Sequence, residues 1–221
     1  LVGAGSGDAP LRVAGAAYSP APGGSTEPDV LQRSGAGWRI TWSGPGGEKV
    51  ARLICDIVNP DGTPFVGCPR TALKRVIGMA DAQGVQVKAG PEAEFFLFQS
   101  RNGRPTTESH DAASYFDLSP VDQGEDVRRE IVLALEAMGL YVDAAHHEVA
   151  PGQHEIDLRY DHVLTTADNI STLRFVVKNI AIRNGLHATF MPKPTYGING
   201  SGMPTHLSLF PNAPNALHAA D

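Results

Sequence analysis

The amino-acid sequence predicts an α+β fold, because helical and extended patterns alternate along its 221 residues. Three segments repeat apolar residues with the period of an α-helix, and the segments between them alternate apolar and polar residues or run apolar, as strands do. The connections are short and do not decide strand direction, so an α/β arrangement is the alternative. Hydrophobic residues make up 42% of the chain and charged residues 19%, which is typical of a soluble globular protein.

The first part of the chain differs from the rest in composition. Residues 1–27 are rich in Gly, Ala, Pro and Ser and are almost uncharged, which predicts a disordered, flexible tail. Residues 38–43 and 50–58 each have a pattern typical of a strand. Asn, Pro, Asp and Gly then cluster at 59–64 and predict a tight turn that ends the second strand.

Three amphipathic helices are expected after this turn, and each is followed by a glycine that can end it. They are expected from Pro69 to just before Gly84, over 125–138 before Gly139, and over 168–184 before Gly185. One face of the first helix carries Leu73, Val76, Ile77 and Ala80. Extended segments are expected at 85–88, 93–98, 141–143, 155–158, 187–191 and 206–210, with Gly90 and Pro91 interrupting the first two.

Composition excludes several classes of protein. No stretch approaches the roughly 18 consecutive apolar residues that a membrane span requires. The net charge of −6 and the lack of a clustered basic run argue against nucleic acid as a partner. The first residues lack the pattern of a signal peptide, and two cysteines, Cys55 and Cys68, are too few for a disulfide framework. We therefore expect a cytoplasmic protein that does not bind membranes.

Two acidic residues precede an aromatic run in the segment Gly-Pro-Glu-Ala-Glu-Phe-Phe-Leu-Phe at 90–98. Side chains two apart in a strand point to the same face, so Glu92 and Glu94 stand side by side. Adjacent carboxylates at a buried strand end repel each other, and either one binds a proton or a cation lies between them. The alternative is that both line a solvated edge.

A second acidic segment, 146–157, holds three histidines and three acids within twelve residues. Glu148 and Glu155 are separated by a Pro-Gly turn, so they can converge from the two sides of a bend. Hard oxygen ligands of this kind suit magnesium or manganese, whereas zinc sites more often show His or Cys at close spacing. A third segment, 193–203, is a glycine-rich loop in which Asn199 offers both a donor and an acceptor. By itself such a loop is also an ordinary turn.

In order and spacing, these segments resemble class I glutamine synthetase. The segments that carry the resemblance are 59–65 (Asn-Pro-Asp-Gly-Thr-Pro-Phe), 90–98, 115–117 (Tyr-Phe-Asp), 146–157, 190–194 and 199–203 (Asn-Gly-Ser-Gly-Met). The similarity runs from about residue 48 to about residue 210. It implies a small β-grasp-like domain over 28–66, here degraded, and an incomplete α/β-type catalytic domain over 67–221.

The resemblance implies an ATP-dependent ligase that joins ammonia to the γ-carboxylate of glutamate through γ-glutamyl phosphate. Two or three Mg²⁺ or Mn²⁺ ions per site neutralise the phosphates in such a reaction. The family's metal ligands fall on Glu92, Glu94, Glu148 and Glu155, and its glutamate-binding positions on Asn199 and Gly200. The ATP-binding positions fall on His206, Ser208 and Tyr160. No catalytic residue is assigned beyond these ligands, and a homo-oligomer, dodecameric in the family, is implied.

The chain departs from the family pattern in three places. Pro204 stands where the family has a metal-binding histidine, and proline offers no ligand atom, so we expect weaker binding at one cation site and tighter binding in a Pro204→His variant. The ammonium-site loop Asp-Gly-Ser-Ser is absent from the sequence. The chain also ends before the arginine-rich segments that complete the site. We therefore expect little or no synthetase activity from this chain alone; a ligase for amines or polyamines and a non-catalytic pseudoenzyme are the alternatives.

Overall fold

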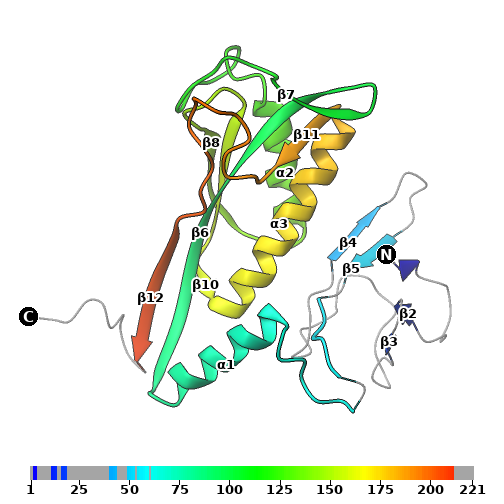
Figure 1. Cartoon of the computed structure of the whole chain (residues 1–221), viewed down its shortest axis with the longest axis vertical. Helices are drawn as coiled ribbons and strands as arrows, with labels where there is room; N and C mark the ends of the chain where they lie inside the picture. Colours follow the sequence, from blue (N-terminus) through cyan, green and yellow to red (C-terminus); the bar gives the residue numbers. More distant parts are fainter. Residues whose placement is uncertain are drawn as a thin grey trace, which may run out of the picture. The chain divides into compact units, whose positions relative to one another are not determined.

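The computed structural model describes residues 54–59 and 61–211 in full, together with the backbone of five short strands before them. These strands are β1 (Val2–Gly3), β2 (Leu11–Val13), β3 (Ala16–Tyr18), β4 (Ile40–Ser43) and β5 (Lys49–Arg52). The chain divides into two units, Leu1–Ala72 and Leu73–Asp221 (Figure 1). Apart from β1 to β3, the predicted tail 1–27 lies outside the described residues, and the division at 27 and 66 stays a prediction.

In the first unit β5 pairs with β1 and β4, and β2 pairs with β3, all antiparallel. The prediction of a strand over 50–58 is wrong in its second half, because β5 ends at Arg52 and Val58 makes only an isolated bridge with Pro64. The predicted turn explains this, since Asn59 N–H donates to Thr63 O at 2.7 Å and the chain closes on itself. Trp38 and Arg39, at the start of the other predicted strand, lie outside the described residues.

Helix α1 (Pro69–Asp81) begins at the predicted residue, where proline's missing N–H costs nothing. After the helix, Gly84 has a φ of +72° and donates its N–H to Asp81 O at 2.9 Å, as expected of a helix-ending glycine. The expected apolar face forms no core, because no residue of α1 is buried and Val76 is 54% exposed.

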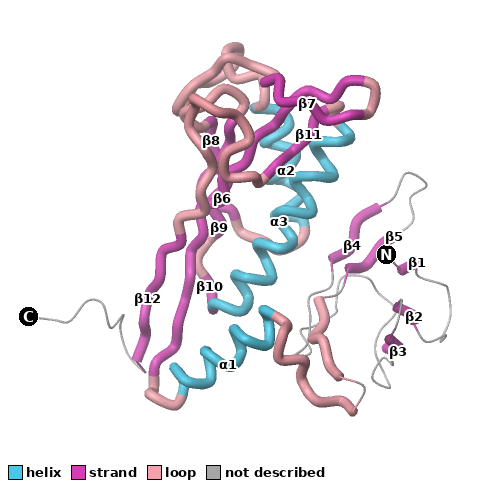
Figure 2. Tube along the Cα trace, viewed as in Figure 1, coloured by secondary structure: helices cyan, strands magenta, loops and turns pink. Residues whose placement is uncertain are grey.

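The second unit is built around one long strand, β6 (Val85–Arg101), which Figure 2 shows running through the sheet. Its antiparallel partners are β7 (Arg104–Ser109), β9 (Gln153–Leu158), β10 (Asp161–His162), β11 (Leu186–Thr189) and β12 (Thr205–Pro211), and β8 (Val142–His147) pairs with β9. The predicted interruption at Gly90 and Pro91 is wrong. Both residues stay in register with β12, and Glu92 N–H continues the ladder to Pro204 O at 2.9 Å.

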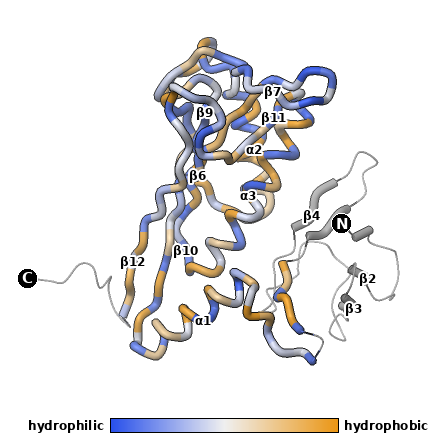
Figure 3. The backbone as a smooth tube through the Cα atoms, in the orientation of Figure 1, coloured by the Kyte–Doolittle hydropathy of each residue, from blue (hydrophilic) through white to orange (hydrophobic). Residues whose placement is uncertain are grey.

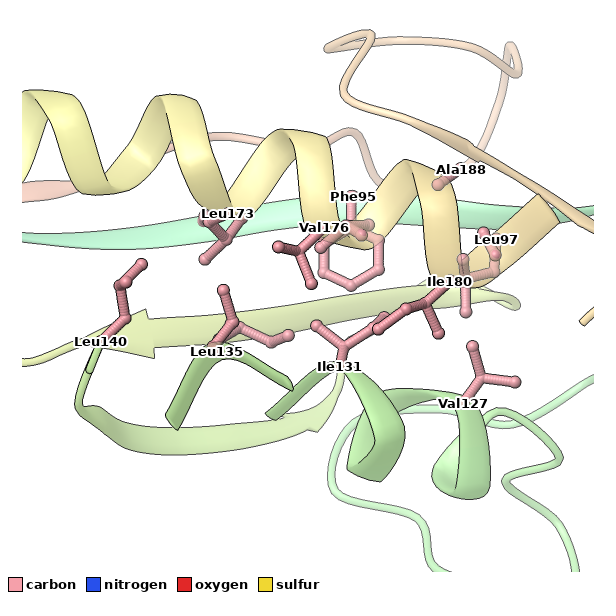
Figure 4. Packing of buried hydrophobic residues seen from close by; sticks show 14 of the residues in the cluster. Phe95, Leu97, Val127, Ile131, Leu135, Leu140, Leu173, Val176, Ile180 and Ala188 are labelled. Carbon is pink, nitrogen blue, oxygen red and sulfur yellow. The ribbon is translucent and has the colours of Figure 1, made fainter. Parts of the chain in front are cut away.

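Helices α2 (Glu125–Ala137) and α3 (Val163–Arg183) cover one face of this sheet. Figure 4 shows side chains of both helices pointing at Phe95 and Leu97 of β6, and the buried cluster they form includes Val127, Ile131, Leu135, Leu173, Val176 and Ile180. Helix α3 begins five residues before the predicted start. Its polar first turn resembles a loop in sequence, but Thr166 Oγ1 donates to Ala89 O and ties the helix to β6.

Successive side chains of β6 point to opposite faces of the sheet, and the two faces differ in burial and chemistry. Phe95 and Leu97 are buried under the helices, whereas Glu92 and Glu94 are only partly buried and project to the opposite face. In Figure 3 the turn between β6 and β7 is hydrophilic, and the hydropathy of α3 alternates along the helix. No helix within the described part of the chain is long and apolar enough to cross a bilayer.

Candidate metal centre

The sheet face opposite the helices carries a group of acidic side chains from β6 and β9. Glu94 on β6 is the cross-strand partner of Glu155 on β9, and Glu92 and Asp157 form the pair two residues along. On the next strand, His146 of β8 pairs with Glu155. Because directly opposed residues of an antiparallel pair have Cβ atoms about 5 Å apart on one face, this register gathers four carboxylates and an imidazole.

Glu148 reaches this group from the end of β8, where the chain turns back into β9. Its N–H donates to Gln153 O at 2.7 Å, and Gly152 in the turn has a φ of +70°, which glycine adopts without strain. The negative charge of Glu148 acts on both Glu94 and Glu155. The Pro-Gly turn therefore brings the acids on its two sides together, as the sequence predicts.

The acids of this face are short of compensating charge. Burial, together with the charges of Asp157 and Glu148, raises the pKa of Glu155 to about 8. Burial also raises the pKa of Asp157 and of Glu94, and for Glu94 the charges of Glu148 and Glu92 add to the effect. One carboxylate must hold a proton near neutral pH, or a cation must neutralise the group.

The residues present fit a divalent cation. Donor atoms of His146, Glu155 and Asp157 lie within 4.8 Å of one another. Asp157 Oδ1 is buried and has no hydrogen-bond partner among the residues described, which leaves a lone pair that a cation would satisfy. Oxygen donors in this number suit Mg²⁺ or Mn²⁺, and a single imidazole is compatible with Mn²⁺.

Three contributors to this face are missing from the sequence-based site: His146, Gln153 and Asp157. The strand period contains a signal for two of them, since Gln153 and Asp157 lie two residues either side of Glu155 and so share its face. Gln153 Nε2 donates to Glu94 Oε2 at 2.9 Å and to Gly200 O at 3.0 Å. This amide therefore links the acidic face to the glycine-rich loop.

The glycine-rich loop runs beside β6 at the same face. Gly200 packs so closely that a Cβ there would collide with Pro192 O, which explains the glycine. Ser201 N–H donates to Pro192 O at 2.8 Å, and Glu94 N–H points to Gly202 O at 3.4 Å. Asn199, the predicted substrate contact, is exposed at the rim of this loop.

The three predicted nucleotide contacts surround the first half of β6. Ser208 of β12 is the cross-strand partner of Lys88, and His206 is the partner of Gly90. Tyr160 lies on the other side of β6, with Lys88 Nζ 5.2 Å from its ring centroid. The structure thus gathers Tyr160, His206 and Ser208 around one short stretch of strand.

His206 also contacts the acidic face, because its Nε2 lies 2.6 Å from Glu92 Oε1. Pro204 directly precedes β12, the strand that carries His206, and its backbone carbonyl accepts the hydrogen bond from Glu92 N–H. The imidazole in contact with Glu92 therefore belongs to His206, two residues after Pro204. Neither side chain is deeply buried, since that of Glu92 is 33% exposed.

A second polar cluster, unforeseen from sequence, lies on the helix-covered face behind β8 and β9. It comprises Asp111, Asp122, Arg128, His147 and His154. Arg128 donates to Asp122 Oδ2 at 2.7 Å and to His154 Nδ1 at 2.9 Å. His147 Nε2 lies 3.3 Å from Asp111 Oδ2. Its side chains are spread over 44 residues of sequence, from 111 to 154, so no local pattern could reveal it.

The charges in this cluster compensate one another. Although burial opposes the charged forms, the hydrogen bonds with His110 and His147 hold the pKa of Asp111 well below its usual range, and the bond to Asp111 raises the pKa of His147. Burial, with the charge of Arg128, lowers the pKa of His154. Because His147 and His154 are the neighbours of Glu148 and Glu155, the cluster supports the strands that carry these acids.

Fold and site together define a class: an α+β protein with a polycarboxylate sheet face fitted to divalent cations. Residues 66–221 match the glutamine synthetase catalytic domain. The chain is 61% identical over 172 residues to glutamine synthetase from Thermus thermophilus and 59% identical over 170 residues to that from Clostridium saccharobutylicum, covering 77% and 76% of this chain. The chain belongs to the glutamine synthetase family.

Solved structures give the same relationship. The cryo-EM structure of Plasmodium falciparum glutamine synthetase aligns with a TM-score of 0.75 at 28% identity, over 83% of this chain and 42% of that one. GmaS in complex with ADP aligns with a TM-score of 0.71 at 33% identity, over 82% of this chain and 42% of that one. The chain spans 39% and 38% of the lengths of the Thermus and Clostridium enzymes. The family and α+β fold predicted from sequence are confirmed.

Proposed function

We propose that the whole protein is an ATP- and divalent-cation-dependent ligase that joins ammonia to the γ-carboxylate of glutamate through γ-glutamyl phosphate. The observation that carries this proposal is the packed acidic face of β6 and β9, whose negative charge a divalent cation would neutralise, in a chain of the glutamine synthetase family. A bound cation would neutralise charge as a phosphoryl group approaches the glutamate carboxylate, itself an anion.

Different residues of this chain bind the cations, glutamate and ATP in the proposed site. Glu92, Glu94, Glu148 and Glu155 hold the cations, with His146 and Asp157 alongside. The loop residues Asn199 and Gly200 hold glutamate, and Gln153 fixes this loop to Glu94. Tyr160, His206 and Ser208 hold ATP beside the first half of β6. The proposed domains are a tail at 1–27, a β-grasp-like domain at 28–66 and a catalytic domain at 67–221.

Cation binding by the 221-residue chain is the first test. Titration calorimetry with Mn²⁺ and with Mg²⁺ should show binding that Glu94→Gln and Glu155→Gln each weaken at least tenfold, since removing one carboxylate ligand removes a direct bond. Glu136→Gln, on the exposed side of α2, is the matched control and should bind like the parent. Equal affinity in all four proteins would contradict the proposed site.

The acceptor is tested by turnover. In the whole protein, phosphate release from ATP in the presence of glutamate should depend on ammonium. Putrescine and ethanolamine serve as competing acceptors. A preference for an amine would replace ammonia as the substrate, and ATP binding without phosphate release with any acceptor would indicate a pseudoenzyme. We also infer a cytoplasmic homo-oligomer; sedimentation velocity checks the oligomer.

A further inference from the structure

Phe116 has a strained backbone conformation beside the acidic face. Within the described part of the chain, the non-glycine residues with positive φ are Asn102, at +52°, and Phe116, at +58°. Asparagine enters this left-handed region readily, as expected in the turn between β6 and β7. For a bulky aromatic residue it is a true outlier, and such outliers persist only where the surroundings enforce them.

Burial does not explain the strain, since Phe116 is 58% exposed. The conformation instead lets the backbone and the ring act on β8 together. Phe116 N–H donates to His147 O at 3.1 Å, and the ring stacks on His146 with centroids 4.3 Å apart and planes 16° apart. Tyr115 meets both rings edge-on.

This stack fixes an imidazole that belongs to the acidic face. His146 Nδ1 donates to His147 O at 3.1 Å, an atom that can only accept, so Nδ1 carries the proton. In the neutral ring Nε2 then presents a lone pair, and it lies 3.2 Å from Glu155 Oε1. A lone pair directed at a carboxylate is unfavourable unless a cation or a proton lies between them, and Asp157 completes the donor group.

We propose that Phe116 is a positioning residue, whose strained backbone holds the His146 imidazole in the orientation that completes a mixed nitrogen and oxygen site for a divalent cation with Glu155 and Asp157. The inference rests on the proposed cation-dependent function. It assigns Phe116 no contact with the cation or the substrates; its ring acts through His146, as groups that orient metal ligands do.

Phe116→Gly tests this directly, because glycine adopts the same backbone conformation without strain and removes the ring. We expect its thermal midpoint to be unchanged or raised, while its Kd for Mn²⁺ rises on the order of tenfold. Phe116→Tyr keeps the ring and should bind Mn²⁺ like the parent. Asn102→Gly makes the matching glycine substitution at the other left-handed residue, away from the site, so it should change neither the Mn²⁺ affinity nor the His146 ring.

Nitrogen-15 NMR of the imidazoles without metal gives a readout independent of cation binding. His146 should show the single Nδ1–H tautomer in the parent and in Phe116→Tyr, and a mixture in Phe116→Gly. A destabilised Phe116→Gly with unchanged tautomer and Mn²⁺ affinity would overturn the inference and leave a purely structural role. If the parent bound no Mn²⁺, the proposed function would fail, while the tautomer measurement would still decide whether Phe116 orients His146.

Discussion

Asp111 is a fully buried carboxylate whose stabilising partners are imidazoles and backbone amides. It accepts a hydrogen bond from Gly152 N–H at 2.8 Å and contacts His147, so it fixes both ends of the β8–β9 bend. Because its pKa is lowered on folding, its stabilising contribution is complete above the unfolded value near 3.9 and is lost as the pH falls below it.

We predict that Asp111→Asn lowers the free energy of unfolding by about 3 kcal/mol at neutral pH, because it removes the carboxylate that pairs with the buried His147 imidazole. The loss should shrink as the pH falls toward 3, since the unfolded parent then binds a proton that the folded Asp111 carboxylate does not. Urea denaturation across this range measures both. Asp143→Asn, at an ion pair whose two side chains are about half exposed, should cost under 1 kcal/mol at every pH.

For Glu155 the pH dependence of stability has the opposite sign to that of Asp111, because folding raises its pKa from 4.5 to about 8. The folded state holds a proton that the unfolded state releases, so without cations the stability falls as the pH rises through this window. We predict that Glu155→Gln raises the metal-free unfolding free energy at pH 8 by on the order of 1 kcal/mol and flattens its pH dependence. Thermal unfolding without and with Mg²⁺ measures this.

The same variant should lose the stabilisation that Mg²⁺ gives the parent, since ligand-linked stability depends on affinity for the folded state. Glu108→Gln, whose exposed side chain pairs with Arg101, should retain it. If the metal-free Glu155→Gln variant were less stable than the parent, the stabilising contacts of the Glu155 side chain would outweigh its repulsion by the neighbouring carboxylates.

The β8–β9 turn is the element on which the site geometry depends. A Cβ on Gly152 would lie 2.8 Å from Leu97 O and 2.7 Å from Ser109 Oγ, and its φ is +70°. We predict that Gly152→Ala costs about 3 kcal/mol, combining backbone strain with a clash against a fixed strand. Gly139→Ala has a similar φ of +78° but open space, and should cost only about 1 kcal/mol. Equal losses in chemical denaturation would mean that the close approach at Gly152 is unimportant.

Elements with one dominant local signal are predicted well from the sequence. Helix α2 and the start of α1 follow from apolar periodicity and from proline and glycine positions, and Glu92 and Glu94 share a face because a strand has a period of two. Where a local sequence signal opposes a long-range pairing, the prediction from sequence is wrong. Gly90 and Pro91 suggest a break, yet the ladder with β12 holds β6 straight through them, and no local pattern carries that long-range pairing.

The candidate site shows the same difference between residues that local sequence patterns predict and contacts that depend on long-range pairing. Acids near in sequence are found, whereas the contact of Glu92 with His206 joins residues 114 positions apart and depends on the register of β12. Asp111 is missed for the same reason, since its partners come from other strands and turns. A pattern restricted to neighbouring residues can identify ligands, but it cannot identify the groups that hold them in place.

At the scale of the molecule, all the acids of the site and the main buried cluster belong to the unit Leu73–Asp221. Each unit in this chain carries its own spectroscopic signal. The two tryptophans, Trp38 and Trp42, lie in Leu1–Ala72, whereas α2 and α3 lie in the second unit. Tryptophan emission therefore reports the first unit, and far-ultraviolet circular dichroism mainly the second.

We predict that Mg²⁺ raises the circular-dichroism midpoint of thermal unfolding by several degrees and leaves the tryptophan midpoint unchanged, because the cation binds only the folded second unit. Leu173→Ala, which removes a fully buried side chain between α3 and the sheet, should lower the circular-dichroism midpoint alone, at a cost of about 3 kcal/mol. If both signals shifted together on adding Mg²⁺ and again in Leu173→Ala, the two units would unfold as one, and cation binding in the second would stabilise the whole chain.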